Sequence, residues 1–305
     1  MIRPPFPTVL DSSMIGSFRS CPYKFATEYL WHWKPKSQSV HLIAGAAYAK
    51  GLEVAREAFY LHGKSPDEAL GAGVGALLAS YGSFECPPDS AKSSTRMAGA
   101  LEFYFSRYPM ADDPAQPVRL PGNKIGVEFS FAEPIDATNP ETGDTILYVG
   151  RMDMICDYAG AVFGEDDKTT SALGASWSKQ WDLRSQFTGY CWGAAKTGFP
   201  LSGFLIRGVS ILKTKYDTAE ALTYRPQWMI DRWYDQLLRD VARIKAAWES
   251  GVWDYSLDAA CNEYGGCAFK QVCLSRDPQP WLEGSFERRK WDPVNRTENL
   301  VLTGE

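Results

Sequence analysis

The sequence predicts an α/β fold, because segments with the pattern of paired strands alternate with segments that carry helix caps and helical spacing. Residues 146–158 and 161–170 are rich in β-branched and apolar side chains, and Ala159-Gly160 between them is typical of a tight turn. A helix is predicted to follow from the N-cap Asp182 to Gly198. Residues 201–213 then predict another strand or a pair of strands.

The remaining elements are predicted in chain order. Ser65-Pro66-Asp67-Glu68 forms a capping box that opens a helix through Leu78, and residues 91–108 predict a second helix. Residues 114–121 are expected to be a loop and residues 139–143 a turn. Residues 227–248 have the spacing of a long amphipathic helix, whereas residues after Pro278 are expected to be loosely held or to face a partner.

Composition indicates an ordinary globular chain that does not enter membranes. It has 305 residues, of which 45% are hydrophobic and 23% charged, enough for one large domain or two modest ones. No apolar run approaches the roughly 18 residues that span a bilayer, and the first residues lack a signal-peptide core. We therefore expect a cytoplasmic protein. A net charge of −5 argues against non-specific coating of DNA, although an acidic metal site can still handle phosphates.

The predicted hairpin carries charges in its middle. A two-residue turn would place Asp153 directly opposite Asp166, with Asp166 and Lys168 on one face and Asp167 on the other. Opposed like charges destabilise a sheet, and Mg²⁺ held by one or two carboxylates would neutralise them. Two alternatives stay open: the polar face is simply solvated, or a three-residue turn shifts the pairing by one residue.

Four cysteines form a second candidate site. The segment CNEYGGCAFKQVC spaces Cys261, Cys267 and Cys273 as C-x5-C-x5-C, and Cys21 is the candidate fourth ligand. Four thiolates hold either a structural zinc ion or an iron–sulfur cluster, and the absence of short paired C-x2-4-C motifs favours iron–sulfur. The other cysteines are expected to be small buried hydrophobes: Cys86, Cys156 and Cys191.

Seven short motifs follow one another along the chain. They are SSMIGSFRSCPYKFATEYL, IAGAAYAKGLE, VEFSF, GRMDMI, GEDDKTT, SQFTGY and the three terminal cysteines. In this order they resemble the PD-(D/E)XK nuclease superfamily, specifically its RecB-like and CRISPR-adaptation exonuclease branch, whose members carry an iron–sulfur cluster. The resemblance extends over most of the chain.

The resemblance implies a restriction-endonuclease-like core, in which helices flank a mixed central β-sheet and a C-terminal iron–sulfur staple joins the chain ends. Residues 1–120 would form a helical segment that includes the first cluster cysteine, and residues 121–250 the nuclease core. Residues 251–275 would bind the cluster, and residues 276–305 would be a tail.

The resemblance also implies residue roles in a metal-dependent DNA exonuclease. Asp153 and Asp166 would bind Mg²⁺ or Mn²⁺, with Glu128 as a supporting carboxylate. Lys168 would be the catalytic lysine, unless it is only the ion-pair partner of the two acids. Gln186 and Tyr190 would lie beside the scissile phosphate. The four ligands of a [4Fe-4S] cluster, with zinc as the alternative, would be Cys21, Cys261, Cys267 and Cys273.

The expected partner is DNA, as single strands or duplex ends, and a recombination or replication protein in repair, recombination or phage DNA processing. Lys179 and Arg184 are candidates for contacts with backbone phosphates. Trp177 and Trp181 could stack on unpaired bases, although core packing is the favoured interpretation for both.

Two features depart from the family pattern. The last cysteine spacing is x5 rather than x2, and the branch commonly has a histidine four residues after a glycine in its second helix, where this chain has Ala49 after Gly45. Glu53, one helical turn further, lies on the same face and is a candidate replacement. The alternative function is therefore a catalytically silent DNA-binding or scaffold subunit. The chain's histidines do not fall at that position and are expected on the surface: His32, His41 and His62.

Overall fold

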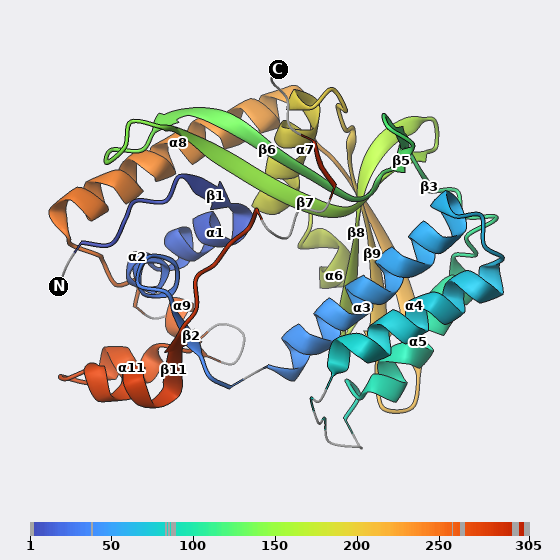
Figure 1. Cartoon of the computed structure of the whole chain (residues 1–305), viewed down its shortest axis with the longest axis horizontal. Helices are drawn as coiled ribbons and strands as arrows, with labels where there is room; N and C mark the ends of the chain where they lie inside the picture. Colours follow the sequence, from blue (N-terminus) through green and yellow to red (C-terminus); the bar gives the residue numbers. More distant parts are fainter. Residues whose placement is uncertain are drawn as a thin grey trace.

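A computed structural model describes residues 3–37, 39–82, 84, 86, 90–257, 259–262 and 266–294, and the backbone of 299–301. Its centre is a mixed sheet in the order β10-β9-β8-β7-β6-β12, with β1 and β3 also pairing with β7 (Figure 1). The strands of this sheet are β1 (Val9–Asp11), β3 (Gln116–Pro117), β6 (Val127–Thr138), β7 (Thr145–Tyr158), β8 (Ala161–Thr170), β9 (Gly203–Ile211), β10 (Tyr216–Tyr224) and β12 (Asn299–Val301).

The sheet combines both kinds of pairing. Strands β6, β7 and β8 are joined antiparallel, as are β9 and β10, whereas β8 runs parallel to β9 and β1 runs parallel to β7. Parallel neighbours need a long crossover connection, which the helices α6 (Ala175–Lys179) and α7 (Ser185–Lys196) provide between β8 and β9. The predicted mixed sheet flanked by helices is confirmed.

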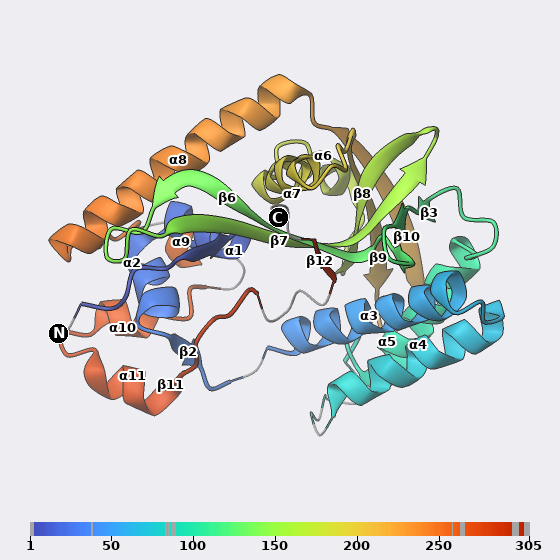
Figure 2. The same cartoon turned by 45° about the horizontal axis from the view of Figure 1, so that its top comes forward.

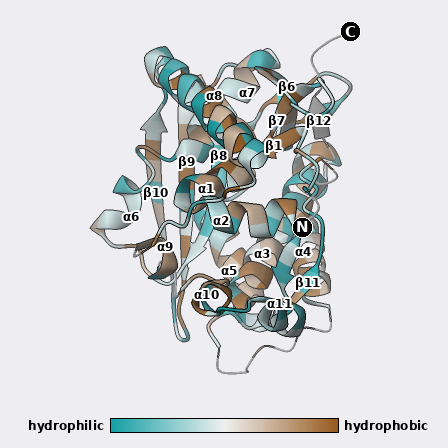
Figure 3. Cartoon of the chain, turned by 90° about the vertical axis from the view of Figure 1, so that its left-hand side faces the viewer, coloured by the Kyte–Doolittle hydropathy of each residue, from teal (hydrophilic) through white to brown (hydrophobic). Residues whose placement is uncertain are grey.

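Helices cover both faces of the sheet (Figure 2). On one face α3 (Val40–Arg56), α4 (Pro66–Tyr81) and α5 (Ser94–Arg107) form an apolar core with β9. On the other, α7 packs between the sheet and α8 (Gln227–Ser250), which also contacts α1 (Ser12–Ser20). Helix α8 carries both hydrophilic and hydrophobic colours in Figure 3, as its one buried face requires.

Smaller elements complete the chain. They are α2 (Pro22–Phe25), the π-helical turns η1 (Ala26–Leu30) and η2 (Glu57–Leu61), β2 (Trp33–Pro35), β4 (Arg119–Leu120), β5 (Lys124–Ile125), α9 (Ala259–Asn262), α10 (Lys270–Leu274), α11 (Gln279–Ser285) and β11 (Phe286–Arg288). No helix in the described ranges is both long and apolar enough to cross a bilayer.

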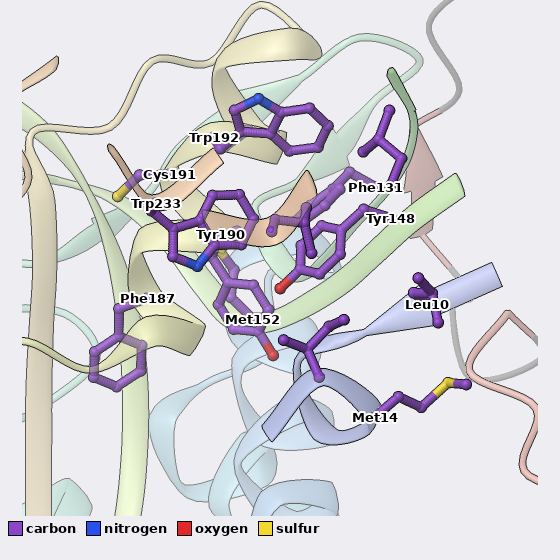
Figure 4. Close-up of a cluster of buried hydrophobic side chains, with 14 of the residues drawn as sticks. Leu10, Met14, Phe131, Tyr148, Met152, Phe187, Tyr190, Cys191, Trp192 and Trp233 are labelled. Carbon is purple, nitrogen blue, oxygen red and sulfur yellow. The ribbon is translucent and has the colours of Figure 1, made fainter. Parts of the chain in front are cut away.

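The core beneath α7 is aromatic. Figure 4 shows Phe131, Tyr148, Tyr190 and Trp233 gathered around this helix, all of them buried. Gly193 of α7 lies directly against the ring of Phe131, because a Cβ atom built on it would be 2.1 Å from a ring carbon. This close approach lets α7 pack directly against β6 and its neighbour β7.

The predicted helices are found with small changes at their ends. The capping box at Ser65 is present, and the helix it opens continues to Tyr81, three residues past Leu78. The helix predicted for residues 91–108 begins at Ser94 after the N-cap Ser93. The long helix predicted from Gln227 ends at Ser250.

The predicted start of the helix after Asp182 is wrong. Helix α7 begins at Ser185, and Asp182 lies in a preceding turn that provides no side-chain cap. The reason is tertiary: Trp181 is buried, and its backbone carbonyl accepts hydrogen bonds from the guanidinium of Arg225 at 2.8 Å and from the N–H of Arg184 at 3.2 Å. These contacts hold residues 181–184 in a turn despite the favourable cap.

Two predictions for irregular segments also need correction. Residues 114–121 contain β3, which pairs with β7, and β4, which pairs with β5. The chain after Pro278 is not loosely held throughout its described part: α11 leads into β11, which pairs with β2, and Trp291 donates to Asp11 at 2.9 Å. Of the histidines, His32 is half-buried rather than exposed.

Candidate active site

The β7–β8 hairpin has the predicted register. Tyr158 pairs with Ala161 and the ladder continues to Met154 with Glu165. The turn residues Ala159 and Gly160 have φ values of 52° and 80°, the left-handed conformations that a two-residue hairpin turn of type I′ requires at both positions. The alternative with a three-residue turn is therefore excluded.

Asp153 lies on β7 between the residues that pair with β1 and those that pair with β8. Strand β7 pairs with β1 at residues 147–149 and with β8 from Met154 onward, so that residues 150–153 stand between these partners. Continuing the β8 register sets Asp153 opposite Asp166. Its Oδ2 accepts a hydrogen bond of 2.7 Å from the backbone N–H of Asp167, a donor that a regular ladder would give to a carbonyl oxygen.

Glu128 extends the row onto a third strand. Val127 pairs with Met154 and Phe129 with Met152, which places Glu128 beside Asp153 on the neighbouring strand β6. Its φ of 50° lies in the left-handed region, an uncommon conformation for a residue with a side chain. Its carboxylate is 2.9 Å from Nε of Arg151. Three acids from three adjacent strands thus form one row.

The two faces of β8 carry different charges, as predicted. Lys168 forms an ion pair with Asp166, whereas Asp167 pairs with Nη1 of Arg56 at 2.8 Å on the α3 side. Asp166 is only 3% exposed, and Lys168, whose side chain is 34% exposed, reaches it from the edge of the site.

Helix α7 brings the predicted glutamine and tyrosine to the same place. The side-chain amide of Gln186 donates to the hydroxyl of Tyr190 at 2.9 Å. Burial raises the pKa of Tyr190, and the negative charge of Asp166 raises it further, so the phenol is neutral and lies within electrostatic reach of the acid. The exposed Arg184, just before α7, is also close enough to favour the charged form of Asp166.

The three acids of the row have raised pKa values, because they are buried close to one another with few positively charged neighbours. Burial, followed by the charge of Asp166, raises the pKa of Asp153 to about 7. Burial, followed by the charge of Asp153, raises the pKa of Glu128 to about 8, and Glu53 of α3 contributes in the same direction. Burial also raises the pKa of Asp166 despite Lys168.

Lys168 responds in the opposite sense. Burial tends to lower the pKa of its ammonium group, but the charges of Asp166 and Asp153 outweigh burial and raise it. The lysine is therefore protonated at neutral pH.

The donor set fits a hard divalent cation. The buried Oδ2 of Asp166 has no hydrogen-bond donor other than its ion-pair partner Lys168 among the described residues, and the pKa values of Asp153 and Glu128 are raised by neighbouring acids. As their side chains stand, no three His, Cys, Asp or Glu residues in the described ranges converge closely enough to hold an ion by themselves. Mg²⁺ keeps several waters and needs only one or two carboxylates, so two acids of the row suffice.

Comparison with known families identifies this arrangement. The family model of the PD-(D/E)XK nuclease superfamily matches residues 12–274, most of the chain. The protein belongs to the PD-(D/E)XK nuclease superfamily. Members of this superfamily generally use Mg²⁺ or Mn²⁺. No curated protein matches.

Two solved structures are distantly similar to this superfamily member. A protein from Eubacterium rectale proposed to be an exonuclease shares 14% identity, with 88% of this chain and 93% of its own covered, at a TM-score of 0.49. The protein SSO0001 shares 16% identity, with coverage of 74% and 86%, at a TM-score of 0.28. Neither likeness is close enough to support an inference about function.

The candidate nucleic-acid contacts divide into two groups. Lys179 and Arg184 are exposed on the segment that leads into α7. Trp177 and Trp181 are each 6% exposed and pack edge to face, and Trp177 also fills the space above Gly208. Because neither indole offers an open face, the interpretation of both as core residues is confirmed, and stacking on a base is incompatible with their placement.

The four candidate cluster cysteines lie around one cavity. Cys21, at the junction of α1 and α2, lines it together with Cys261, Cys267 and Cys273. An N-terminal and a C-terminal segment contact each other beside this cavity. The N–H of Tyr23 donates to the carbonyl of Asp254 at 3.0 Å, and the rings of Tyr23 and Tyr255 stack with their centroids 4.4 Å apart.

The chemistry of this cavity fits a group held by thiolates. All four cysteines are free. Burial raises the pKa of Cys273 to about 11, and the three other thiols raise it as well, which places each of them within interaction range of Cys273. They are not drawn together into a closed ligand set in the part of the chain that the structure describes. Cys156 and Cys191 are buried hydrophobes, as predicted, and Cys86 is half-buried.

Sequence reasoning missed the arginines around the acid row. Arg151 pairs with Glu128, and Arg56 pairs with Asp167 behind the row. The role of Arg56 could have been predicted from the sequence. Arg56 follows Glu53 by three residues, and both lie on the face of the helix that otherwise carries small or hydrophobic residues. A charged pair on the buried face of such a helix indicates partners on the sheet.

Proposed function

We propose that this protein is a metal-dependent deoxyribonuclease that acts as an exonuclease of the RecB-like branch. The observation that carries the proposal is the row Glu128, Asp153 and Asp166 on three adjacent strands, with Lys168 beside it, in a chain that belongs to a nuclease superfamily. The exonuclease mode rests on the order of the sequence motifs.

The three carboxylates would hold Mg²⁺ or Mn²⁺. When bound, the ion supplies Lewis-acid stabilisation of the phosphate and lowers the pKa of a coordinated water. Asp153 is already oriented for this role, because the N–H of Asp167 fixes one of its oxygens and leaves the other for the ion. Asp166 would be freed from part of its contact with Lys168.

Lys168 would stabilise charge rather than remove a proton. Its raised pKa keeps it protonated, so it suits the neutralisation of the developing phosphate charge and the orientation of the attacking water. Gln186 holds the Tyr190 hydroxyl near the same point, where it would donate to a phosphate oxygen. Lys179 and Arg184 would contact phosphates further along the DNA strand.

The missing histidine weakens the case for catalysis less than the sequence alone indicates. Ala49 is half-buried and has no donor atom, but Glu53 on the same helix is 9% exposed and close enough to Glu128 to raise its pKa. We infer that Glu53 supplies the acidic group at this side of the site. Ala49 is also the feature that favours the second candidate, a silent DNA-binding or scaffold subunit.

The cysteine cavity would hold a [4Fe-4S] cluster that joins the chain ends. Its role would be structural, since a group bound only by the folded form stabilises that form. Anaerobically purified protein is expected to be brown with broad visible absorbance. A colourless protein that contains one zinc ion per chain would instead assign the site to zinc.

A nuclease assay tests the proposal. End-labelled linear single-stranded and duplex DNA, incubated with Mg²⁺ or Mn²⁺, should be shortened from an end by the wild-type protein. Asp166→Ala and Lys168→Ala should lose cleavage while their thermal unfolding stays cooperative. DNA binding without cleavage in either metal would favour the scaffold subunit. The setting that we propose is repair, recombination or phage DNA processing in the cytoplasm, with a recombination or replication protein as partner.

A further inference from the structure

Strand β8 carries a second pair of acids behind the candidate active site. Asp166 and Lys168 face the α7 side, whereas Glu165 and Asp167 face the helices α3 and α5. The side chains of Glu165 and Asp167 are 0% and 2% exposed. Two carboxylates without water need partners at close range, and two buried arginines provide them.

Arg56, the last residue of α3, binds both of these acids. Its Nη1 is 2.8 Å from Asp167, and its Nη2 contacts Glu165 and donates to the hydroxyl of Tyr104 at 2.7 Å. The Arg56 side chain is almost completely buried. Through this one guanidinium, α3 and α5 are both joined to Glu165 and Asp167, the two neighbouring side chains on this face of β8.

Arg207 of β9 forms the far end of the same network. It makes a bidentate pair with Asp113 at 2.6 and 2.7 Å, lies 3.5 Å from Glu165 and bonds to Glu220 at 2.9 Å. Buried ion pairs seldom stabilise a fold more than well-packed apolar residues would, because desolvation offsets most of their attraction. A network of this size is therefore better explained by the geometry it fixes than by stability.

The backbone of Asp167 connects this buried network to the row of acids. Its N–H donates to Oδ2 of Asp153 at 2.7 Å, at the point where the ladder between β7 and β8 ends. The side chain of the same residue is held by Arg56 from behind. One residue thus connects the buried network to the carboxylate that would bind the ion.

We propose that Asp167 is a positioning residue: its ion pair with Arg56 fixes the peptide group that orients Asp153, so that Asp153 and Asp166 face one divalent cation. The inference rests on the metal site of the proposed function and adds to it the residues that hold its geometry. Partners of metal ligands in this position typically contribute about 10- to 100-fold to metal affinity.

The test compares Mn²⁺ affinity among variants by titration calorimetry, with thermal unfolding and the kcat and KM for DNA measured alongside. Asp167→Asn keeps the size and the backbone N–H but removes the charge that Arg56 holds. It should bind Mn²⁺ about tenfold more weakly and lower kcat, with KM for DNA unchanged. Glu220→Gln is the matched control, because it weakens a contact of Arg207 without touching Asp167, and its Mn²⁺ affinity should equal that of the wild type.

Tyr104→Phe is a milder variant that removes one acceptor from Arg56, and it should show a smaller loss of Mn²⁺ affinity in the same direction. If Asp167→Asn fails to fold, this variant decides the question. Wild-type affinity in the folded variants, or an equal loss in Glu220→Gln, would overturn the positioning role alone. A wild-type protein that binds no Mn²⁺ would overturn the metal site itself.

Discussion

Binding of the metal ion should release protons from the acid row at neutral pH. With pKa values of about 7 and about 8, Asp153 and Glu128 are partly protonated at pH 7 when no metal is present. About half of the Asp153 carboxyls and about nine-tenths of the Glu128 carboxyls carry a proton under these conditions. An ion held by all three carboxylates of the row, as proposed, needs Asp153 and Glu128 ionised, so binding should displace roughly one to one and a half protons.

The sign of the pH dependence follows from the same values. Both pKa values are raised, so below about pH 8 protons compete with the ion, and above about pH 9 both acids are already largely ionised. Mn²⁺ affinity should therefore rise by roughly 10- to 30-fold per pH unit near pH 7 and level off at higher pH.

Calorimetric titration in two buffers with different enthalpies of protonation measures this release directly. At pH 7 the apparent binding enthalpies should differ by the released protons multiplied by the difference in buffer enthalpy, and at pH 9.5 the difference should nearly vanish. Asp153→Asn should bind more weakly and release at least half a proton fewer, because it removes one titrating group and also the charge that raises the pKa of Glu128. Equal heats in both buffers at pH 7 would refute the electrostatic description of the row.

Three further predictions concern single residues. Lys168→Arg should abolish cleavage without loss of stability, measured by end-labelled DNA assay and thermal unfolding, because the planar guanidinium cannot replace a compact charge on a flexible stem. Cys267→Ala should remove the visible absorbance and leave the protein insoluble, which absorption spectra and soluble yield would show. Gly193→Ala should destabilise the fold by about 1–3 kcal/mol in chemical unfolding, since the added methyl meets the Phe131 ring, whereas Gly45→Ala should not, because no atom lies within 4 Å of its added methyl.

Local rules were sufficient to predict the hairpin and the position of Asp153 opposite Asp166, whereas Glu128 was predicted only from the family resemblance. The turn at Ala159-Gly160 fixes the register, and period-two alternation then sets which of Asp166, Asp167 and Lys168 share a face. Both rules act over a few residues, so they survive in the folded chain. The capping box at Ser65 was predictable for the same reason.

The contacts that sequence reasoning missed join residues far apart in the chain. Arg56 and Asp167 are separated by more than a hundred residues, and only the packing of α3 against β8 brings them together. The misplaced start of α7 has the same origin, because a hydrogen bond from Arg225 to the carbonyl of Trp181 outweighs a good local cap at Asp182. Pairing of β11 with β2 likewise depends on where the two chain ends meet.

The gap in the sheet explains how the protein tolerates a row of acids. In a continuous ladder, Asp153 and Asp166 would be directly opposed like charges, which destabilise a pair of strands. Here the ladder stops at Met154, and the Asp153 carboxylate itself accepts the N–H of Asp167 that pairing would otherwise use. The acids on the other face of β8, Glu165 and Asp167, are compensated by Arg56, whereas the acids that face the site are compensated only in part. Their mutual repulsion, relieved only in part by Lys168 and Arg151, is what makes a divalent cation the natural complement of this surface.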